Sequence, residues 1–175
     1  MKKDWDDLNG QKAIDYFKEL NKNRQTYTSL MGSGNTALDF GAGVGRNINS
    51  ILENFNSVVA YDLPNVVELL DNFDGIYDKS KTTYTSDWLD VSNKNFDCIY
   101  IDSVFHHIEK DELLSYLADM SKMTDKMIVN ERRLIDDKHR DILPILNKYF
   151  HVNVLKVHSD PYGFEMFVAE LNKIL

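Results

Sequence analysis

Ten consecutive residues carry most of the structural information in this chain: Leu38-Asp39-Phe40-Gly41-Ala42-Gly43-Val44-Gly45-Arg46-Asn47. An apolar run ends in an acid, three glycines then alternate with small residues, and a helical pattern follows. Glycine at alternate positions allows a sharp turn from strand to helix and lets a ligand lie against bare main chain. The stretch therefore predicts a buried strand, a ligand-binding loop and a helix of an α/β fold.

The glycine spacing and the acid narrow the choice of ligand. The dinucleotide fingerprint is G-x-G-x-x-G, whereas here the glycines fall as G-x-G-x-G and Arg46 takes the place of the last fingerprint glycine. A carboxylate at Asp39 would repel a pyrophosphate, but it would attract a ligand that carries an ammonium group. S-adenosylmethionine carries an ammonium and a sulfonium, so the loop chemistry favours this cofactor over NAD.

The rest of the chain alternates between short apolar runs and helical patterns, which predicts a parallel sheet covered on both faces. Strands are expected at 36–40, 58–62, 82–85, 97–101 and 126–130, and helices at 47–56, 65–72, 110–123 and 137–149, the last bent near Pro144. Residues 152–158 and 164–171 are expected to form a closing hairpin, which adds an antiparallel edge.

Composition limits the class of protein and its partners. A chain of 175 residues with 43% hydrophobic residues can form one domain with a full core. A net charge of -8 argues against nucleic acid as the main partner. Cys98 is the only cysteine, and no stretch has the length of a membrane span. With no secretory signal behind the first lysines, these features predict a cytoplasmic protein.

Three further segments resemble the motifs of a known family in order and spacing. They are Val58-Val59-Ala60-Tyr61-Asp62, Tyr84-Thr85-Ser86-Asp87-Trp88 and the run from Phe96 to Ile108. Together with the glycine loop they resemble class I S-adenosylmethionine-dependent methyltransferases over roughly residues 36 to 170. The resemblance implies a three-layer, Rossmann-like α/β fold with a mostly parallel seven-stranded sheet and an antiparallel last strand. It also implies methyl transfer from S-adenosylmethionine to an acceptor, which we expect to be a small molecule.

Acids follow four of the predicted strands, at Asp39, Asp62, Asp87 and Asp102. Open α/β sheets bind ligands beyond the carboxyl ends of their strands, where these acids would crowd together and repel one another without a cationic ligand. Asp62 follows the glycine loop at the distance expected for a ribose-binding acid; the alternative is an N-cap.

The resemblance adds roles for three further residues. It implies that Leu63 lies near the adenine face, that Asp87 accepts from the adenine amino group and that Trp88 packs on the ring; the alternative for the last pair is a turn acid beside a core aromatic. The predicted cofactor-binding residues are therefore Asp39, Gly41, Gly43, Gly45, Asp62, Leu63, Asp87, Trp88 and Asp102.

A general base is needed only if the acceptor arrives protonated. The candidates follow the fourth strand: His107 first, His106 second, and Asp102. A structural role for His107 at the start of the next helix is the alternative. The two adjacent histidines have no further ligands nearby, so no metal site is predicted. Arg46 is expected at the surface or helix start, and Glu131 in a solvated loop.

Residues 1–35 are predicted to form an N-terminal helical segment that could act as a lid, and residues 36–175 the methyltransferase domain, as a monomer or homodimer. Four alternatives stay open: a non-catalytic subunit that binds S-adenosylmethionine, a protein methyltransferase, an enzyme that transfers a different group from a sulfonium donor, and a nicotinamide oxidoreductase, which Asp39 and Arg46 disfavour.

Overall fold

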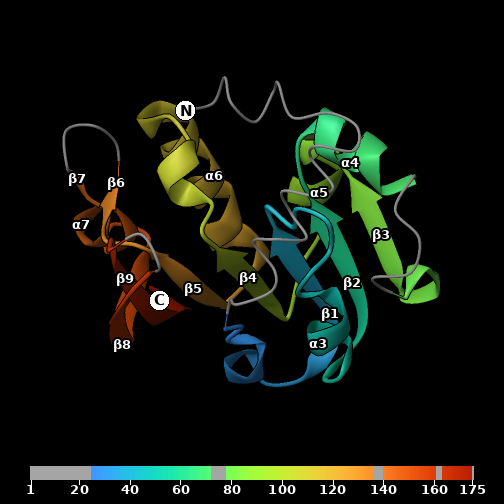
Figure 1. Cartoon of the computed structure of the whole chain (residues 1–175), viewed down its shortest axis with the longest axis horizontal. Coiled ribbons are helices and arrows are strands. Elements are labelled where there is room, and N and C mark those ends of the chain that lie inside the picture. The colour runs from blue at the N-terminus through green and yellow to red at the C-terminus, as the bar shows by residue number, and fades with distance from the viewer. Residues whose placement is uncertain (1–24, 72–77, 136–139, 161–162, 175) are drawn as a thin grey trace.

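The computed structural model describes residues 25–71, 78–135, 140–160 and 163–174. Within them, seven strands form one sheet in the order β3-β2-β1-β4-β5-β9-β8, and two short strands form a second sheet, β6-β7 (Figure 1). Most of the predicted N-terminal lid, residues 1–24, lies outside the described residues.

The large sheet has the predicted parallel core. The parallel strands are β1 (Gly34–Phe40), β2 (Phe55–Tyr61), β3 (Thr82–Thr85), β4 (Cys98–Asp102) and β5 (Lys126–Arg132). The last strand, β9 (Glu165–Lys173), pairs antiparallel with both β5 and β8 (Phe150–Ser159). The antiparallel last strand is thus confirmed, but it lies inside the sheet, and β8 forms the edge.

Two of the predicted helices are wrong in extent. The helices are α3 (Ile48–Leu52), α4 (Pro64–Asp71), α5 (Trp88–Ser92), α6 (Lys110–Met123) and α7 (Leu143–Leu146), with 3₁₀ turns η1 (Thr28–Met31), η2 (Lys79–Lys81) and η3 (Phe105–His107). The helix predicted to reach residue 56 stops at Leu52, because Phe55 is buried as the first residue of β2.

The helix predicted at 137–149 is replaced, in its described part, by β7 (Arg140–Asp141) and α7. β7 pairs with β6 (Leu134–Ile135). Pro144 lies in the first turn of α7, where a missing N–H costs nothing, so it starts a helix instead of bending one.

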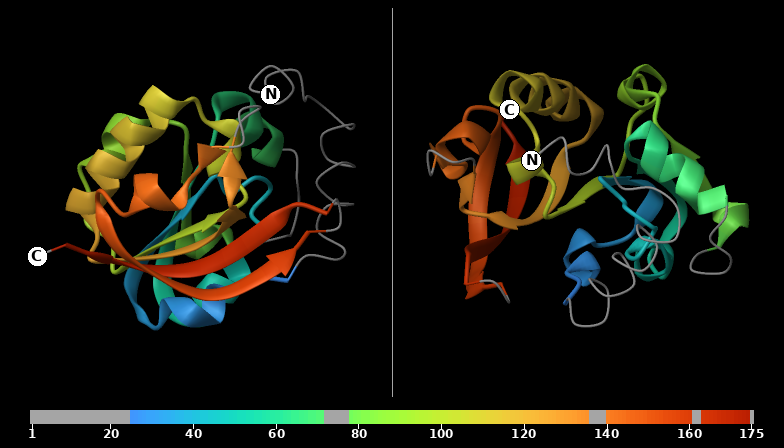
Figure 2. Two further views of the ribbon diagram at one scale, coloured as in Figure 1. Left: turned by 90° about the vertical axis from the view of Figure 1, so that its left-hand side faces the viewer. Right: turned by 45° about the horizontal axis from the view of Figure 1, so that its top comes forward.

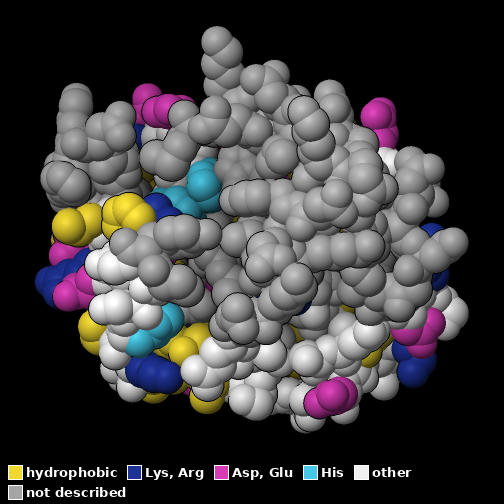
Figure 3. All heavy atoms as spheres, in the orientation of Figure 1, with side chains coloured by type: hydrophobic (Ala, Val, Ile, Leu, Met, Phe, Trp, Pro, Cys, Tyr) yellow, Lys and Arg dark blue, Asp and Glu magenta, His cyan; other side chains and the backbone are white. Residues whose placement is uncertain are grey.

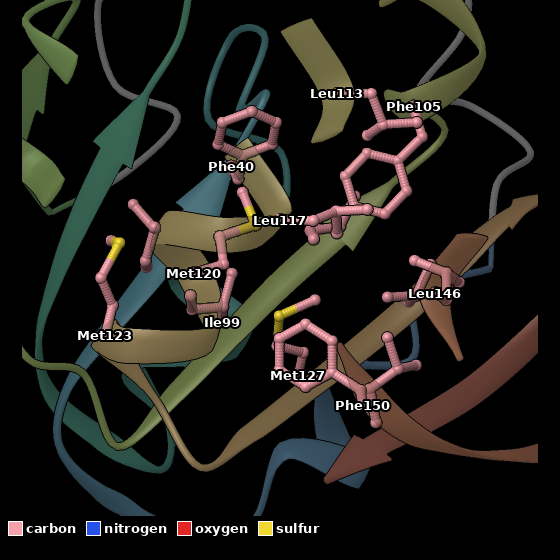
Figure 4. Close-up of a cluster of buried hydrophobic side chains, with 14 of the residues drawn as sticks. Phe40, Ile99, Phe105, Leu113, Leu117, Met120, Met123, Met127, Leu146 and Phe150 are labelled. Atoms are coloured by element: carbon pink, nitrogen blue, oxygen red, sulfur yellow. The ribbon is translucent and has the colours of Figure 1, made fainter. Parts of the chain in front are cut away.

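Successive side chains of a strand point to opposite faces of the sheet, and each face has its own core. On the α6 face, the helix residues Leu113, Leu117 and Met120 pack against Ile99 and Met127 (Figure 4). On the η1 face, the core is built by η1, α3 and the alternate strand residues (Figure 2, left). Burying each large side chain stabilises the fold by roughly 1.5–3 kcal/mol. The packing on both faces of the sheet therefore holds the ends of the strands in place.

Candidate active site

The glycine loop after β1 has a backbone conformation that glycine favours, and at Gly41 it has no room for a side chain. Gly41, Gly43 and Gly45 have φ of 73°, 58° and 79°, the left-handed region that glycine tolerates best. A Cβ on Gly41 would lie 2.3 Å from Cγ2 of Val104, in the segment after β4. The Gly41 amide donates to the Tyr61 carbonyl at 2.8 Å. The loop therefore lies between the ends of β2 and β4.

Asp39 is buried at the end of β1 with an incomplete set of hydrogen bonds. Its side chain is on the η1 face, because Leu38 and Phe40 belong to the α6-face core. The residue is 1% exposed, and among the described residues its Oδ2 has no hydrogen-bond partner. Burial raises the pKa of Asp39 to about 7, repulsion from Asp102 and Asp62 adds to this, and Arg46 opposes it. A cation beside this carboxyl would keep it ionised.

The unpaired buried atoms of the described residues all lie at this loop. They are Oδ2 of Asp39, Nη1 of Arg46 and Oδ1 of Asn47. Buried polar atoms are nearly always hydrogen-bonded, so a group of three without partners marks a place where a ligand completes the bonding. Two acceptors and one donor suit a ligand that carries both an ammonium and a carboxylate.

Arg46 is not the surface residue that the sequence predicts. Its Nη2 forms an ion pair with Oδ2 of Asp102 at the end of β4. The Arg46 side chain is only 16% exposed, since it lies among the acids at the strand ends. The clustered acids at the strand ends attract Arg46, a cation of the chain itself. The local sequence does not indicate this position, because the acids come together only in the fold.

Asp62 holds the glycine loop from the end of β2. Its Oδ2 accepts from the Gly43 amide at 2.7 Å, and its Oδ1 accepts from the Leu63 amide at 2.7 Å. Burial raises the pKa of Asp62 to about 6, although both amides act against this rise. The described bonds are to the loop and to the next residue, and each carboxylate oxygen keeps capacity for a second donor.

Asp87 and Trp88 follow β3 as predicted, and the structure gives both a structural role. Asp87 caps α5 by accepting from the amides of Leu89 and Asp90 at 2.9 and 3.3 Å. Trp88 lies in an aromatic cluster on the α6 face, formed with Phe40, Tyr61 and Tyr116. Contact of either residue with adenine stays a prediction.

Asp102 anchors a polar chain that crosses the sheet on the η1 face. Its Oδ1 accepts from Nδ2 of Asn130 on β5 at 2.9 Å, and Oδ1 of Asn130 lies 3.1 Å from Nε2 of His158 on β8. Asp102 and Asn130 are buried, and His158 is half-buried. Asn130 and His158 were not predicted, because only the nonlocal pairing of β5, β9 and β8 brings them to the site.

Glu131 is buried, which contradicts the predicted solvated loop. It is 0% exposed and lies on the α6 face, next along β5 from Asn130. Its Oε2 accepts from the amides of Val104 and Phe105 at 2.7 and 2.6 Å, and its Oε1 lies 2.6 Å from Nδ1 of His106. Burial acts to raise the pKa of Glu131, but His106 and the backbone amides outweigh burial and lower it.

His106 and His107 lie in η3, immediately after β4. His106 is buried against Glu131, while His107 is half-buried. Their ring centroids are 3.8 Å apart, and the ring planes are tilted by 43°. The structure thus brings Asp102 and both histidines to the carboxyl end of β4, as predicted, and adds Glu131 as the residue that fixes His106.

Comparison with known proteins identifies the architecture. The family model for a methyltransferase domain matches residues 38–126, more than half of the chain. The chain belongs to this family. The predicted class I, S-adenosylmethionine-dependent methyltransferase is thereby confirmed as to family, fold and enzyme class. No curated protein matches the sequence.

Solved structures share the fold of this methyltransferase at low identity. The N-methyltransferase NodS of Bradyrhizobium japonicum WM9, in complex with S-adenosyl-L-homocysteine, is 11% identical with a TM-score of 0.63, covering 97% of this chain and 90% of that chain. Magnesium protoporphyrin IX methyltransferase of Synechocystis PCC 6803, with bound S-adenosylmethionine, is 13% identical with a TM-score of 0.66, covering 93% and 92%.

The described residues contain no group of three or more His, Cys, Asp or Glu side chains that could hold a metal ion. None of the described helices is long and apolar enough to cross a membrane.

Proposed function

We propose that this methyltransferase binds S-adenosylmethionine at the glycine loop and methylates a small-molecule acceptor at the carboxyl ends of β4 and β5. The observation that supports the proposal most directly is the buried Oδ2 of Asp39, which has no partner and whose carboxyl has a pKa raised to about 7. A cationic ligand removes the cost of ionising this group in a buried place. A pyrophosphate would increase that cost.

The residues present fit this cofactor. Asp39 would meet its ammonium group, and the unpaired Nη1 of Arg46 suits its carboxylate. Asp62 would accept from ribose hydroxyls, while Gly41, Gly43 and Gly45 keep the backbone bare. We carry forward Leu63, Asp87 and Trp88 as adenine-side residues and Asp102 as the acid beside the methionine end. When bound, the cofactor would supply a methyl group that is attached to a sulfonium sulfur. The neutral thioether that remains after transfer is an excellent leaving group.

The chain's own residues position the acceptor and accept its proton. A carboxylate can only accept hydrogen bonds, so Nδ1 of His106 must donate to Glu131, and Nε2 is left as the atom that can take a proton. Glu131 fixes the orientation of the ring through this bond, as the carboxylate does in other carboxylate–histidine pairs. We therefore propose His106 as the general base in preference to His107, the first choice from sequence.

The cofactor proposal is tested by calorimetry with S-adenosylhomocysteine and with NAD. We expect the protein to bind S-adenosylhomocysteine and not NAD, and Asp62→Asn to weaken that binding by about tenfold, since a hydrogen bond to a charged group contributes roughly 1.5–3 kcal/mol. Asp90→Asn, an exposed acid on α5, is the matched control and should bind normally. Equal affinity of Asp62→Asn and the parent would refute the ribose contact.

The base is tested on acceptor pools of hydroxyl and amine compounds, with release of S-adenosylhomocysteine as the readout. We expect His106→Gln to lower the rate by about 10²–10⁴-fold at unchanged cofactor affinity, and exposed His151→Gln to have no effect. A normal rate in His106→Gln would rule this base out. Cofactor binding with no turnover on any acceptor would favour a non-catalytic subunit, and turnover only on proteins would favour a protein methyltransferase.

Cytoplasmic location and a monomeric or homodimeric state complete the proposal. Cys98 is buried, and burial raises the pKa of its thiol to about 12, which suits an unreactive residue in a reducing compartment. Sedimentation of the purified protein measures the oligomeric state.

A further inference from the structure

Charge changes sign along the carboxyl edge of the sheet. Asp39, Asp62 and Asp102 end the strands β1, β2 and β4, while Lys156 and His158 lie near the end of β8. Strands are about 4.8 Å apart, so β1 and β8 are separated by about 19 Å across β4, β5 and β9. Figure 3 shows a histidine beside a basic side chain over the region of β8 and β9, on the lower left.

The chain from Asp102 fixes the orientation of His158. Asp102 forms an ion pair with Arg46, and its Oδ1 accepts from Nδ2 of Asn130. The Oδ1 of Asn130 then faces Nε2 of His158, so this nitrogen carries the proton. His158 is thereby tied to the acid at the methionine end of the proposed cofactor site, and it belongs to that site instead of to a separate surface.

Lys156 lies beside His158 and has no counter-ion among the residues that the structure describes. The two residues are two positions apart on β8 and pair with Val168 and Met166 of β9, so their side chains share the η1 face. Among the described residues, the partners of Lys156 Nζ are neutral: Oη of Tyr27 at 3.3 Å and Oε1 of Gln25 at 3.5 Å. The Tyr27 ring also lies 5.4 Å below the ammonium.

The acids on the neighbouring strand ends have other partners. Asp160 pairs with Arg132 at 3.4 Å, and Glu170 pairs with Lys126 at 3.5 Å. The positive charge of Lys156 is therefore not neutralised from within the described part of β8 and β9. A carboxylate or phosphate group of a ligand would provide the missing partner.

We infer that the ammonium of Lys156 binds an anionic group of the methyl acceptor, beside the His158 ring, whose Nε2–H is taken by Asn130, and the Tyr27 hydroxyl, which donates to Oε1 of Gln25. The inference rests on the proposed function, because it assumes that the acceptor lies between the glycine loop and β8. It narrows the acceptor to a small molecule that carries a carboxylate or a phosphate on the side away from the methylated atom. The acidic end of the site would hold the cationic cofactor and the basic end the anionic acceptor.

The test follows the His158 ring by NMR while inorganic phosphate or acetate is added at constant ionic strength, with and without S-adenosylhomocysteine. We expect a saturable shift of the ring resonances, weakened by about fivefold in Lys156→Met. Lys122→Met removes an exposed lysine of α6 and should leave the shift unchanged. A response to phosphate alone assigns a phosphorylated acceptor, and a response to acetate alone a carboxylate.

Two outcomes overturn the inference: no saturable shift with either anion, or an equal shift in the parent and Lys156→Met. Calorimetric titration of Lys156→Met with phosphate or acetate gives a second readout, in which we expect weaker binding than in the parent, and the variant should fold because Lys156 is exposed. Failure to bind S-adenosylhomocysteine refutes the proposed function instead, and the titration without cofactor still decides on the anion site.

Discussion

Two buried carboxylates on opposite faces of the sheet differ in how completely they are hydrogen-bonded. Asp39, on the η1 face, has one oxygen without a partner, and burial raises its pKa to about 7. Glu131, on the α6 face, uses both oxygens to accept from backbone amides and faces His106, and its pKa is lowered. Equal burial therefore goes with pKa shifts in opposite directions, because Glu131 faces His106 and accepts from backbone amides, whereas Asp39 is repelled by Asp102 and Asp62 and is less completely hydrogen-bonded.

The difference assigns separate tasks to the two faces. An unpaired buried carboxyl is unfavourable in the free protein and becomes favourable when a cation binds, so the η1 face is prepared for a ligand. A fully bonded carboxylate stabilises the free protein, so Glu131 on the α6 face fixes the segment that carries His106. On the η1 face, a bound cation would therefore relieve an unfavourable buried carboxyl. On the α6 face, the hydrogen bonds of Glu131 hold the segment that carries His106 in place.

The largest expected effect is on the α6 face. Glu131→Ala leaves the amides of Val104 and Phe105 buried without an acceptor, and it leaves His106 without its carboxylate. We expect the free energy of unfolding to fall by about 3–5 kcal/mol, measured by urea denaturation. Glu165→Ala, at an exposed acid, should cost less than about 1 kcal/mol. If Glu131→Ala lost as little unfolding free energy as Glu165→Ala, the difference in hydrogen bonding between Asp39 and Glu131 would be contradicted.

A comparison of Gly41 with Gly163 tests how closely the glycine loop approaches Val104. Gly41 and Gly163 have φ of 73° and 84°, but a Cβ on Gly41 would collide with Val104, whereas a Cβ on Gly163 has no atom within 4 Å. Gly163→Ala should cost only the backbone strain, about 1–2 kcal/mol. Gly41→Ala should cost at least about 1 kcal/mol more and should weaken binding of S-adenosylhomocysteine. Equal unfolding free energies of the two variants would contradict the close approach of Gly41 to Val104.

Asp39→Asn should act on stability and binding in opposite directions. A carboxyl whose pKa is higher in the folded chain binds more protons there than in the unfolded chain, so its contribution to stability is present below pH 3.8 and lost as pH rises through about 7. At pH 8 the neutral amide should therefore stabilise the free protein by roughly 1–3 kcal/mol, measured by urea denaturation. The same variant should bind S-adenosylmethionine more weakly.

The proton balance gives this prediction an independent readout. Binding of a cation at pH 6 should release a proton from Asp39, which calorimetry detects as a dependence of the binding heat on the buffer. The dependence should be absent in Asp39→Asn and retained in the exposed control Asp90→Asn. Proton release that is unchanged in Asp39→Asn would assign it to another group, with Asp62 the next candidate because burial raises its pKa to about 6.

Sequence predicted those parts of the fold and site that depend on local pattern. The helix at Lys110–Met123 and the strand at Thr82–Thr85 have the predicted bounds, because one shows a regular apolar stripe and the other is bounded by polar turns. The acids at strand ends were predicted for the same reason: a strand end is visible in the sequence as the end of an apolar run.

The remaining site residues depend on side-chain direction and nonlocal pairing. Glu131 follows a buried strand in sequence, and counting alternate residues from Val129 would have placed it on the buried α6 face. Nothing local marks Asn130 and His158, which meet only because β9 lies between β5 and β8. Arg46 is drawn inward by Asp102, a residue that lies far from it in the sequence.

The smallest expected effect concerns the hydrogen bond between Trp88, a residue of the predicted adenine side, and Asp119 on α6. Nε1 of Trp88 donates to Oδ2 of Asp119 on α6 at 3.1 Å. Trp88→Phe and Asp119→Ala should each cost about 1 kcal/mol of unfolding free energy, and the double variant less than the sum, since both remove the same bond. If Trp88 also contacts adenine, Trp88→Phe alone weakens binding of S-adenosylhomocysteine; if Trp88 is only part of the aromatic core, both variants bind equally. An additive double variant would contradict the hydrogen bond, and the α6 face would then not be fully bonded at this end.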